Sequence, residues 1–209
     1  MFVTFEGIEG SGKSTLIELV QQQSGVLGVP VVTTREPGGT PVGNAIRAVF
    51  LDPSLQIDPI AEAFLVNASR AQLVADVIRP ALRKEAIVLC DRFFDATVAY
   101  QGFGRGLDVE VLIELCLTAT QSLAPDLTIL LDVPVGVAFE RLRLRHESSG
   151  IGADRMEREN ADFHERVRQG YLTLAKRFPR FVVLDAQTPP GALALEALGQ
   201  IEHHRVHPR

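Results

Sequence analysis

A glycine-rich segment near the start of the chain carries the residue types that bind phosphate. It runs Gly7, Ile8, Glu9, Gly10, Ser11, Gly12, Lys13, Ser14, and it fits the pattern G-x-x-x-x-G-K-[ST]. Backbone N–H groups of such a loop, and the helix N-terminus after it, converge on phosphate oxygens. We expect Lys13 to reach the β- and γ-phosphates of a nucleotide and the Ser14 hydroxyl to ligate Mg²⁺. The alternative is a glycine-rich turn without a ligand.

Charged residues also follow two other apolar runs. Arg35 precedes Pro-Gly-Gly at 37–39, a tight turn that would hold the arginine at the rim of a sheet. Asp91 and Arg92 close a further run, where Asp91 could hold Mg²⁺ through water and Arg92 could clamp a phosphate. The alternatives are a plain turn with a solvated Arg35, and an Asp91 that caps the next helix.

Residues four apart share one face of a helix, and two such pairs are candidates for a binding site. Val66 and Arg70 form one pair on a long helical stretch. Thr97 and Gln101 form the other if residues 95–101 are helical.

Arginines gather in the stretch 141–158. Arg141 and Arg145 are four apart, and Arg143 would point to the opposite side of the same helix. Arg155 and Arg158 follow a polar segment, residues 147–152, that reads as a linker. The cluster could supply a catalytic cation, or it could be a solvated helix face.

Strands alternate with helices along the whole chain, which predicts an α/β fold with a parallel sheet flanked by helices. The expected strands are 2–6, 29–34, 86–90, 127–132 and 181–184, each continuously apolar as in strands buried on both faces. The expected helices are 13–24, 41–51, 59–83, 108–121, 135–146, 158–177 and 191–203. Ligands bind such sheets beyond the carboxyl ends of the strands, where Gly7, Arg35, Asp91, Arg92, Asp132 and Asp185 all stand.

Composition narrows the class of protein. A length of 209 residues suits a single domain, and 46% hydrophobic residues describe an ordinary globular protein. The net charge of -5 disfavours a general nucleic-acid surface. No run is long and apolar enough for a membrane span, and the N-terminus lacks the layout of a signal peptide. Cys90 and Cys116 read as reduced core thiols, so we expect a cytoplasmic protein.

The sequence lacks the motifs of other classes of P-loop protein. A GTPase needs an N-K-x-D stretch, which does not occur. A motor or clamp ATPase usually has acidic pairs at its strand ends, whereas the strand ends here carry single aspartates followed by Arg, Val or Ala. His203, His204 and His207 could form a metal site, although a solvated tail is the simpler interpretation.

Several dispersed motifs together resemble the bacterial thymidylate kinases, a family of P-loop nucleoside monophosphate kinases. They stand in that family's order over nearly the whole chain: the P-loop with Glu9, Thr34–Thr40, Asp91-Arg92-Phe93, Ala99-Tyr100-Gln101-Gly102, Arg105-Gly106, Pro125-Asp126-Leu127, Asp154-Arg155-Met156-Glu157 and Asp185-Ala186-Gln187. The P-loop alone indicates only a nucleotide enzyme, whereas the set is specific.

The resemblance implies a three-layer P-loop fold with five parallel strands and a mobile lid at about 141–158. It implies transfer of the γ-phosphoryl group of ATP to dTMP with Mg²⁺, in a homodimer. Lys13, Arg92 and Arg145 would be catalytic, and Ser14 and Asp91 would hold the metal. Residues 7–14 and Gln187 would bind ATP. In the dTMP site, Arg35, Arg70 and Arg92 would hold the phosphate, with Arg47 nearby. Val66, Thr97 and Gln101 would contact the base. Glu9 would lie at the sugar 3′-hydroxyl, and Tyr100 at the 2′ position.

Two features depart from that family's pattern. The stretch 146–153 lengthens the lid, which leaves the roles of Arg155 and Arg158 open. Val66 stands where the family has a Phe that stacks on thymine. A P-loop kinase acting on another deoxynucleotide or nucleoside is the nearest alternative, and a non-kinase P-loop ATPase or binding module is the next.

Overall fold

One parallel sheet of five strands forms the centre of the computed structural model, which describes residues 1–150 and 152–207. The strands are β1 (Phe2–Glu6), β2 (Val31–Arg35), β3 (Ile87–Asp91), β4 (Leu127–Asp132) and β5 (Phe181–Asp185), in the order β2-β3-β1-β4-β5. All adjacent pairs are parallel. The predicted fold class and the five predicted strands are therefore confirmed, with bounds shifted by at most two residues.

Burial separates the central strands from the edge strands. The central strands β1, β3 and β4 are buried, except for the final residue of β3 and of β4, as their apolar sequences predict. The same expectation is wrong for β2 and β5, whose residues are mostly half-buried or exposed. These two strands lie at the edges of the sheet. The helices cover the edges incompletely, so the side chains of β2 and β5 stay partly exposed to solvent.

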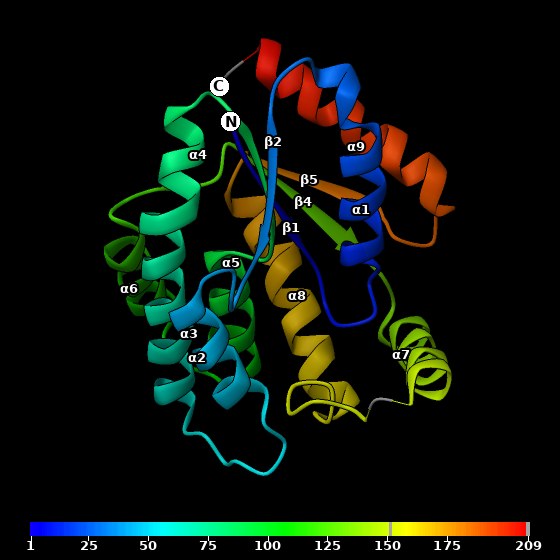
Figure 1. Cartoon of the computed structure of the whole chain (residues 1–209). Helices are drawn as coiled ribbons and strands as arrows, with labels where there is room; N and C mark the ends of the chain where they lie inside the picture. The colour runs from blue at the N-terminus through cyan, green and yellow to red at the C-terminus, as the bar shows by residue number, and fades with distance from the viewer. Residues whose placement is uncertain (151, 208–209) are drawn as a thin grey trace.

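Helices cover both faces of the sheet (Figure 1). Together α1 (Lys13–Gln23) and α9 (Pro190–Val206) cover one face. The other face is covered by α3, α4, α5, α6 and α8, while α2 packs on α3. Their bounds are α2 Pro41–Leu51, α3 Pro59–Leu73, α4 Arg79–Arg83, α5 Phe94–Thr97, α6 Val109–Thr120, α7 Val135–Ser149 and α8 Ala161–Arg177.

The predicted helix 59–83 is interrupted near its end. A wider, π-helical segment, Val74–Ile78, separates α3 from α4, and the Arg79 N–H bonds back to Val74 O. Pro80 accounts for the interruption, because it lacks an N–H and its ring crowds the carbonyl four residues earlier. A second such segment, Val98–Gly104, follows α5.

The helix α7 is longer than predicted. It continues to Ser149, so the polar stretch 147–152 is not wholly a linker. Arg143 bonds both Glu140 and Glu147 along the helix, and Gly150 ends it in a left-handed conformation with φ 67°. Among the described residues no helix has the length and apolar character needed to span a membrane.

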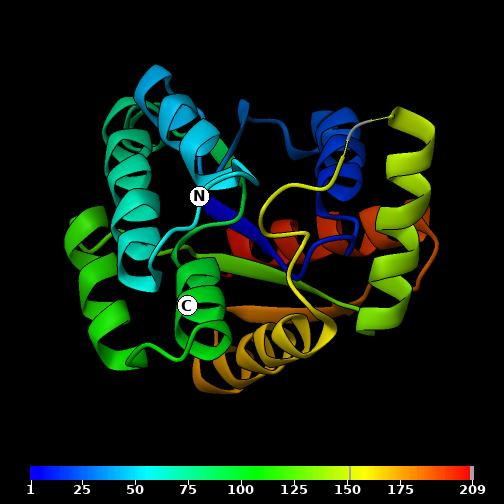
Figure 2. The ribbon, with the colours of Figure 1, turned by 90° about the horizontal axis from the view of Figure 1, so that it is seen from below.

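The carboxyl ends of the strands meet at one edge of the sheet, seen in Figure 2. The P-loop follows β1 there, and Thr40 caps α2 by accepting from Gly43 N after the turn that follows β2. Residues 152–160, which precede α8, lie across this edge, where Arg155 N bonds Leu51 O at the end of α2. This edge therefore collects residues from distant parts of the sequence.

Candidate active site

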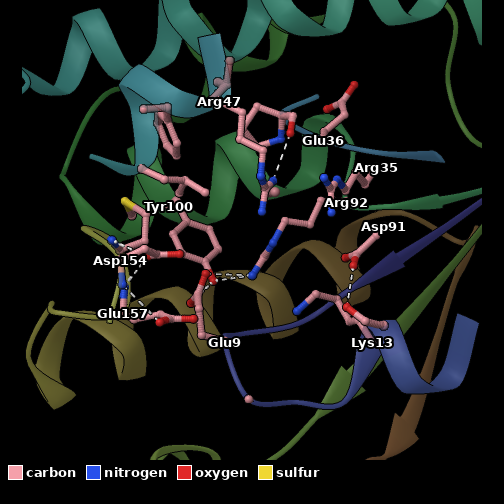
Figure 3. Close-up of a pocket in the computed structure, with 18 of the residues that line it drawn as sticks. Glu9, Lys13, Arg35, Glu36, Arg47, Asp91, Arg92, Tyr100, Asp154 and Glu157 are labelled. Carbon is pink, nitrogen blue, oxygen red and sulfur yellow. Dashed lines mark hydrogen bonds and ion pairs between the residues drawn. The ribbon is translucent and has the colours of Figure 1, made fainter. Parts of the chain in front are cut away.

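A cavity of about 470 Å³ opens at the carboxyl edge of the sheet (Figure 3). It is lined by most of the residues singled out from the sequence: Glu9, Gly10, Gly12, Lys13, Ser14, Arg35, Arg47, Val66, Arg70, Asp91, Arg92, Thr97, Tyr100, Gln101 and Arg145. The strand ends, α2, α3, α5 and α7 each contribute. A smaller cavity of about 270 Å³ adjoins it and shares Gly12, Thr15 and Arg141 in its lining.

The P-loop is curled around the side chain of Lys13. The Lys13 ammonium donates to Gly7 O at 3.0 Å and to Ile8 O at 2.9 Å, and Gly7, Gly10 and Gly12 have positive φ. A Cβ on Gly10 would lie 2.3 Å from Ala138 O, so glycine is required for the loop to approach α7. Burial, together with repulsion from Arg92, lowers the pKa of Lys13 to about 8.

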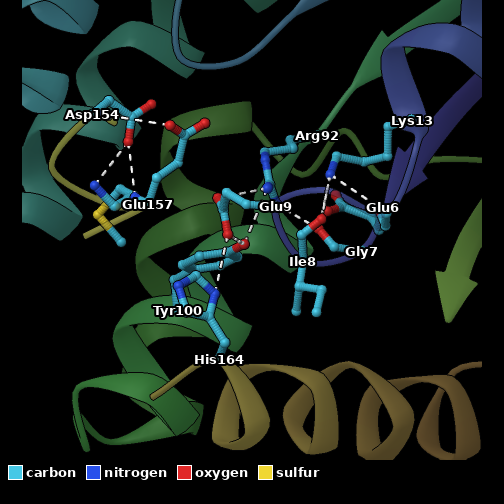
Figure 4. A network of polar contacts seen from close by, with 12 residues as sticks. Glu6, Gly7, Ile8, Glu9, Lys13, Arg92, Tyr100, Asp154, Glu157 and His164 are labelled. Atoms are coloured by element: carbon cyan, nitrogen blue, oxygen red, sulfur yellow. Dashed lines mark hydrogen bonds and ion pairs between the residues drawn. The ribbon is translucent and has the colours of Figure 1, made fainter. Parts of the chain in front are cut away.

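Glu9 is the centre of a polar network at the loop (Figure 4). Its carboxylate accepts from Arg92 Nη2 at 2.8 Å and from the Tyr100 hydroxyl, and His164 Nδ1 lies 3.4 Å away. Burial acts to raise the pKa of Glu9, but Arg92, His164 and Lys13 outweigh it and hold the pKa well below its usual range. Glu9 is therefore a fixed anion facing the cavity.

Three arginines form a cationic corner at the rim. Arg92 bonds Gly7 O, Glu9 and the hydroxyls of Tyr100 and Tyr171, and within the described residues its Nε–H has no acceptor. Arg47 donates to Pro37 O at 2.9 Å. Burial, and then repulsion from Arg35, lowers the pKa of Arg47. Arg35 has no carboxylate partner among the described residues. Glu9 therefore compensates the charge of Arg92, whereas Arg35 and Arg47 have no carboxylate partner within the described structure.

Arg70 differs from these three because it is fully satisfied by the protein. Only 1% of it is exposed, and it donates to Glu36, Asn67, Phe93 O, Thr97 and the Cys116 sulfur. These five bonds use all of its donors. To hold a phosphate, as predicted, Arg70 would have to release one of them.

The cavity lining includes the apolar side chains of Val66 and Phe50 and the polar side chains of Thr97 and Gln101. Phe64 is 57% exposed and does not line the cavity, so it does not replace the missing stacking ring. Thr97 and Gln101 are four residues apart and both line the cavity, in agreement with their predicted position on one face.

A site for a divalent ion can be assembled beside Lys13. The Ser14 hydroxyl donates to Asp91 Oδ2 at 3.0 Å, and Asp91 Oδ1 is buried without a hydrogen-bond partner in the described structure. Oxygen donors of this kind suit Mg²⁺, which is usually held by one or two carboxylates plus substrate phosphates. Within the described residues no cluster of three or more His, Cys, Asp or Glu could hold a metal.

The helix α7 contributes Arg145 to the cavity lining. Its side chain is 55% exposed and bonds Glu157, which also bonds His146 at 3.0 Å. Arg141, one turn earlier, donates to Ser11 O and Ala186 O and so joins the P-loop to the segment after β5. Gln187 lines the smaller cavity beside that segment.

Comparisons with known proteins give the same family over most of the chain. A family model described as Thymidylate kinase matches residues 5–196. The chain belongs to the thymidylate kinase family. It is 50% identical over 206 residues to "Thymidylate kinase" from Desulfovibrio desulfuricans, covering 97% of this chain and 95% of that protein. It is 51% identical over 205 residues to that of Citrifermentans bemidjiense, covering 95% and 91%. The crystal structure of thymidylate kinase from Ehrlichia chaffeensis is 32% identical, with a TM-score of 0.74 and coverage of 96% and 98%.

This thymidylate kinase family member also has site residues that sequence reasoning missed. Glu62 is fully buried and bonds Gln101, Arg105 and Arg155. His164 reaches Glu9 from α8, and Glu36 pairs with Arg70 at 2.8 Å. A signal for Glu62 was available, because it stands four residues before Val66 and eight before Arg70 on the same helix face.

Proposed function

We propose that this protein transfers the γ-phosphoryl group of ATP to the phosphate of dTMP, giving dTDP and ADP. The observation that carries the proposal is the placement of Arg35, Arg47 and Arg92 opposite Lys13 in one cavity. A phosphate-binding loop and a separate cluster of arginines in the same cavity suit an enzyme that brings two phosphates together. The names of the relatives supply the acceptor, dTMP.

The reaction is an in-line displacement. An oxygen of the dTMP phosphate attacks the γ-phosphorus, and the bond from that phosphorus to the β,γ-bridging oxygen breaks as ADP leaves. Most of the catalysis is positioning and charge neutralisation, because the two reacting groups are both anionic. Lys13 stabilises the β- and γ-phosphates, and Arg92 binds the acceptor through its available Nε–H. Arg145 of the lid leaves Glu157 to bind the transferred group.

Asp91 and the Ser14 hydroxyl hold Mg²⁺ in this proposal. The ion supplies positive charge to the phosphate oxygens when it is bound. Asp91 orients the Ser14 hydroxyl, and its free oxygen Oδ1 is available for a bound water.

The nucleoside of dTMP lies in the large cavity beside Val66, Thr97 and Gln101. Thr97 and Gln101 contact the base edge, and Val66 covers a base face with its methyl groups. Glu9 lies next to the sugar 3′-hydroxyl, and Tyr100 crowds the 2′ position against ribonucleotides. Adenine of ATP lies in the smaller cavity beside Gln187.

The acceptor phosphate is held by Arg35, Arg47 and Arg92, and Arg70 takes a supporting part. This assignment of roles to the arginines differs from the one expected from the family resemblance, in which Arg70 contacts the phosphate directly. The reason is the pairing of Arg70 with Glu36, a carboxyl whose pKa burial raises to about 7 against the attraction of Arg70. Arg70 therefore holds Thr97 and the floor of the cavity in place.

We further propose that the enzyme is a cytoplasmic homodimer. Exposed apolar side chains on α2, α3 and α6 support a dimer surface, and buried free Cys90 and Cys116 suit a reducing compartment.

The experiment measures ADP release from ATP·Mg²⁺ with dTMP, dUMP, dCMP, thymidine and no acceptor in parallel. We expect dTMP to be the best acceptor and thymidine to be close to the no-acceptor rate, because the three rim arginines require a phosphate. A preference for thymidine or dCMP would overturn the proposal.

A further inference from the structure

Glu62 is a buried acidic residue that contacts Gln101 of the cavity lining, and it has no part in the proposed reaction. It stands on α3 with 0% of its surface exposed. Its carboxylate accepts from Arg105 Nη2 at 3.0 Å, from Arg155 Nη1, and from Gln101 Nε2 at 2.9 Å. Two guanidinium groups thus hold the carboxylate, and one amide from the cavity wall completes its set of partners.

This contact determines which way the Gln101 amide faces. The oxygen and nitrogen of an amide are nearly equal in size, so a glutamine with neutral neighbours can turn over and exchange donor for acceptor. A carboxylate held between two guanidinium groups can only accept, so Nε2 must face Glu62 and Oε1 must face away. Gln101 lines the cavity, and none of the described residues donates to its Oε1.

An acceptor fixed in this position distinguishes pyrimidines by the atom at N3. Thymine and uracil carry a hydrogen there and can donate to Oε1, whereas cytosine has a lone pair that would face another acceptor. We propose that Glu62 is a positioning residue for specificity: by locking the Gln101 amide, it makes the cavity accept bases with an N3–H and reject cytosine. This inference rests on the proposed placement of the dTMP base beside Gln101.

The variant that tests this role is Glu62→Gln, which keeps the size of the side chain. A glutamine at 62 can accept from or donate to Gln101, so the Gln101 amide becomes free to turn over. The readout is the ratio of kcat/KM for dUMP to that for dCMP, because these two acceptors share every group except the base edge at positions 3 and 4. We expect the ratio to fall roughly tenfold or more, mainly through KM.

A matched control separates this effect from loosening of the lid. Glu159 also pairs with Arg105, at 2.6 Å, but does not contact Gln101. We expect Glu159→Gln to keep the wild-type ratio, since a change in the lid alters both acceptors alike. A ratio in Glu62→Gln within about twofold of wild type, in a protein that folds, would overturn the inference.

Wild-type enzyme supplies a second measurement that needs no variant to fold. We expect it to use dUMP far better than dCMP, and to use N3-methyl-dTMP poorly because the N3–H is gone. Equal use of dUMP and dCMP, alongside normal activity on dTMP, would overturn the inference and leave the proposed function standing. Absence of activity on dTMP would instead sink the proposed function.

Discussion

Arg145 is the residue whose proposed catalytic part is easiest to isolate. It lines the cavity from α7 and is half-exposed, so its removal leaves the core unchanged. We expect Arg145→Ala to lower kcat on the order of 10³-fold with little change in the KM for dTMP, because its charge stabilises the transferred group more than the ground state. Steady-state kinetics with saturating ATP measures both constants.

Arg143 provides the control on the same helix. It is similarly exposed but bonds Glu140 and Glu147 and does not line the cavity. Arg143→Ala should keep near-normal kcat. Near-normal turnover in Arg145→Ala, with loss in Arg141→Ala or Arg155→Ala, would show that another lid arginine is the catalytic one.

Val66 supports a second prediction at this scale. A phenylalanine there would stack on the base, which contributes about 0.5–1.5 kcal/mol beyond area burial, or roughly 2- to 12-fold in affinity. We expect Val66→Phe to lower the KM for dTMP by such a factor with little change in kcat. Val26→Phe, at a site 72% exposed and outside the cavity lining, should change neither constant. A clearly higher KM in a normally folded Val66→Phe would mean that the ring clashes with the wall that includes Phe50.

Among the elements, β1 and α8 are joined by a buried carboxyl at the end of β1. Glu6 accepts from Phe93 N and from the Tyr171 hydroxyl, both at 2.7 Å. Burial, with Asp95 nearby, raises the pKa of Glu6 from 4.5 to about 8. Between these two values the folded state binds more protons than the unfolded state, so the free energy of unfolding falls as pH rises.

Substitution of Glu6 removes that titration. We expect Glu6→Gln to lose less stability than wild type between about pH 5 and about pH 8, by on the order of 3 kcal/mol. Urea unfolding at the two pH values measures the difference. Part of the slope should remain, because Glu36 also has a raised pKa. The exposed Glu18→Gln serves as the control, and a Glu6→Gln slope equal to its slope would contradict the assignment.

The elements also show how far sequence reasoning reaches. Central strands and the P-loop were predictable, because buried parallel strands are continuously apolar and the loop has a fixed glycine spacing. The break after α3 is caused by Pro80. The prediction of one helix over 59–83 did not take this proline into account. The spacing of Glu62 to Val66 and Arg70 could have placed it on the cavity side of its helix. Its partners could not be predicted, because they lie 39, 43 and 93 residues away and such distant pairs have no local pattern. Arg70 was placed in the cavity correctly, but its pairing with Glu36 could not be read from spacing.

For the whole molecule, the surface of α2, α3 and α6 tests the proposed homodimer. Ile60 and Phe64 are 43% and 57% exposed on one face of α3, and Val42 and Val111 are exposed on α2 and α6. Burial of such side chains in a second copy would stabilise a dimer. We expect wild type to sediment as a dimer and Phe64→Glu to shift toward monomer, because the carboxylate would be buried unpaired.

The control places the same charge elsewhere. Leu195 is 64% exposed on α9, on the opposite side of the sheet from α3, and Leu195→Glu should remain a dimer. Wild type that sediments as a monomer at all concentrations tested would rule out the homodimer without affecting the proposed chemistry.

The most direct test of the proposed function follows the phosphoryl group itself. Wild-type protein is incubated with Mg²⁺, dTMP and ATP labelled at the γ-phosphate, and the nucleotides are separated. We predict that the label appears in dTDP at the rate at which ADP forms, and that Lys13→Ala, which lacks the cation at the γ-phosphate, transfers it far more slowly. Label released as inorganic phosphate, with dTMP unchanged, would contradict a kinase and indicate an ATPase.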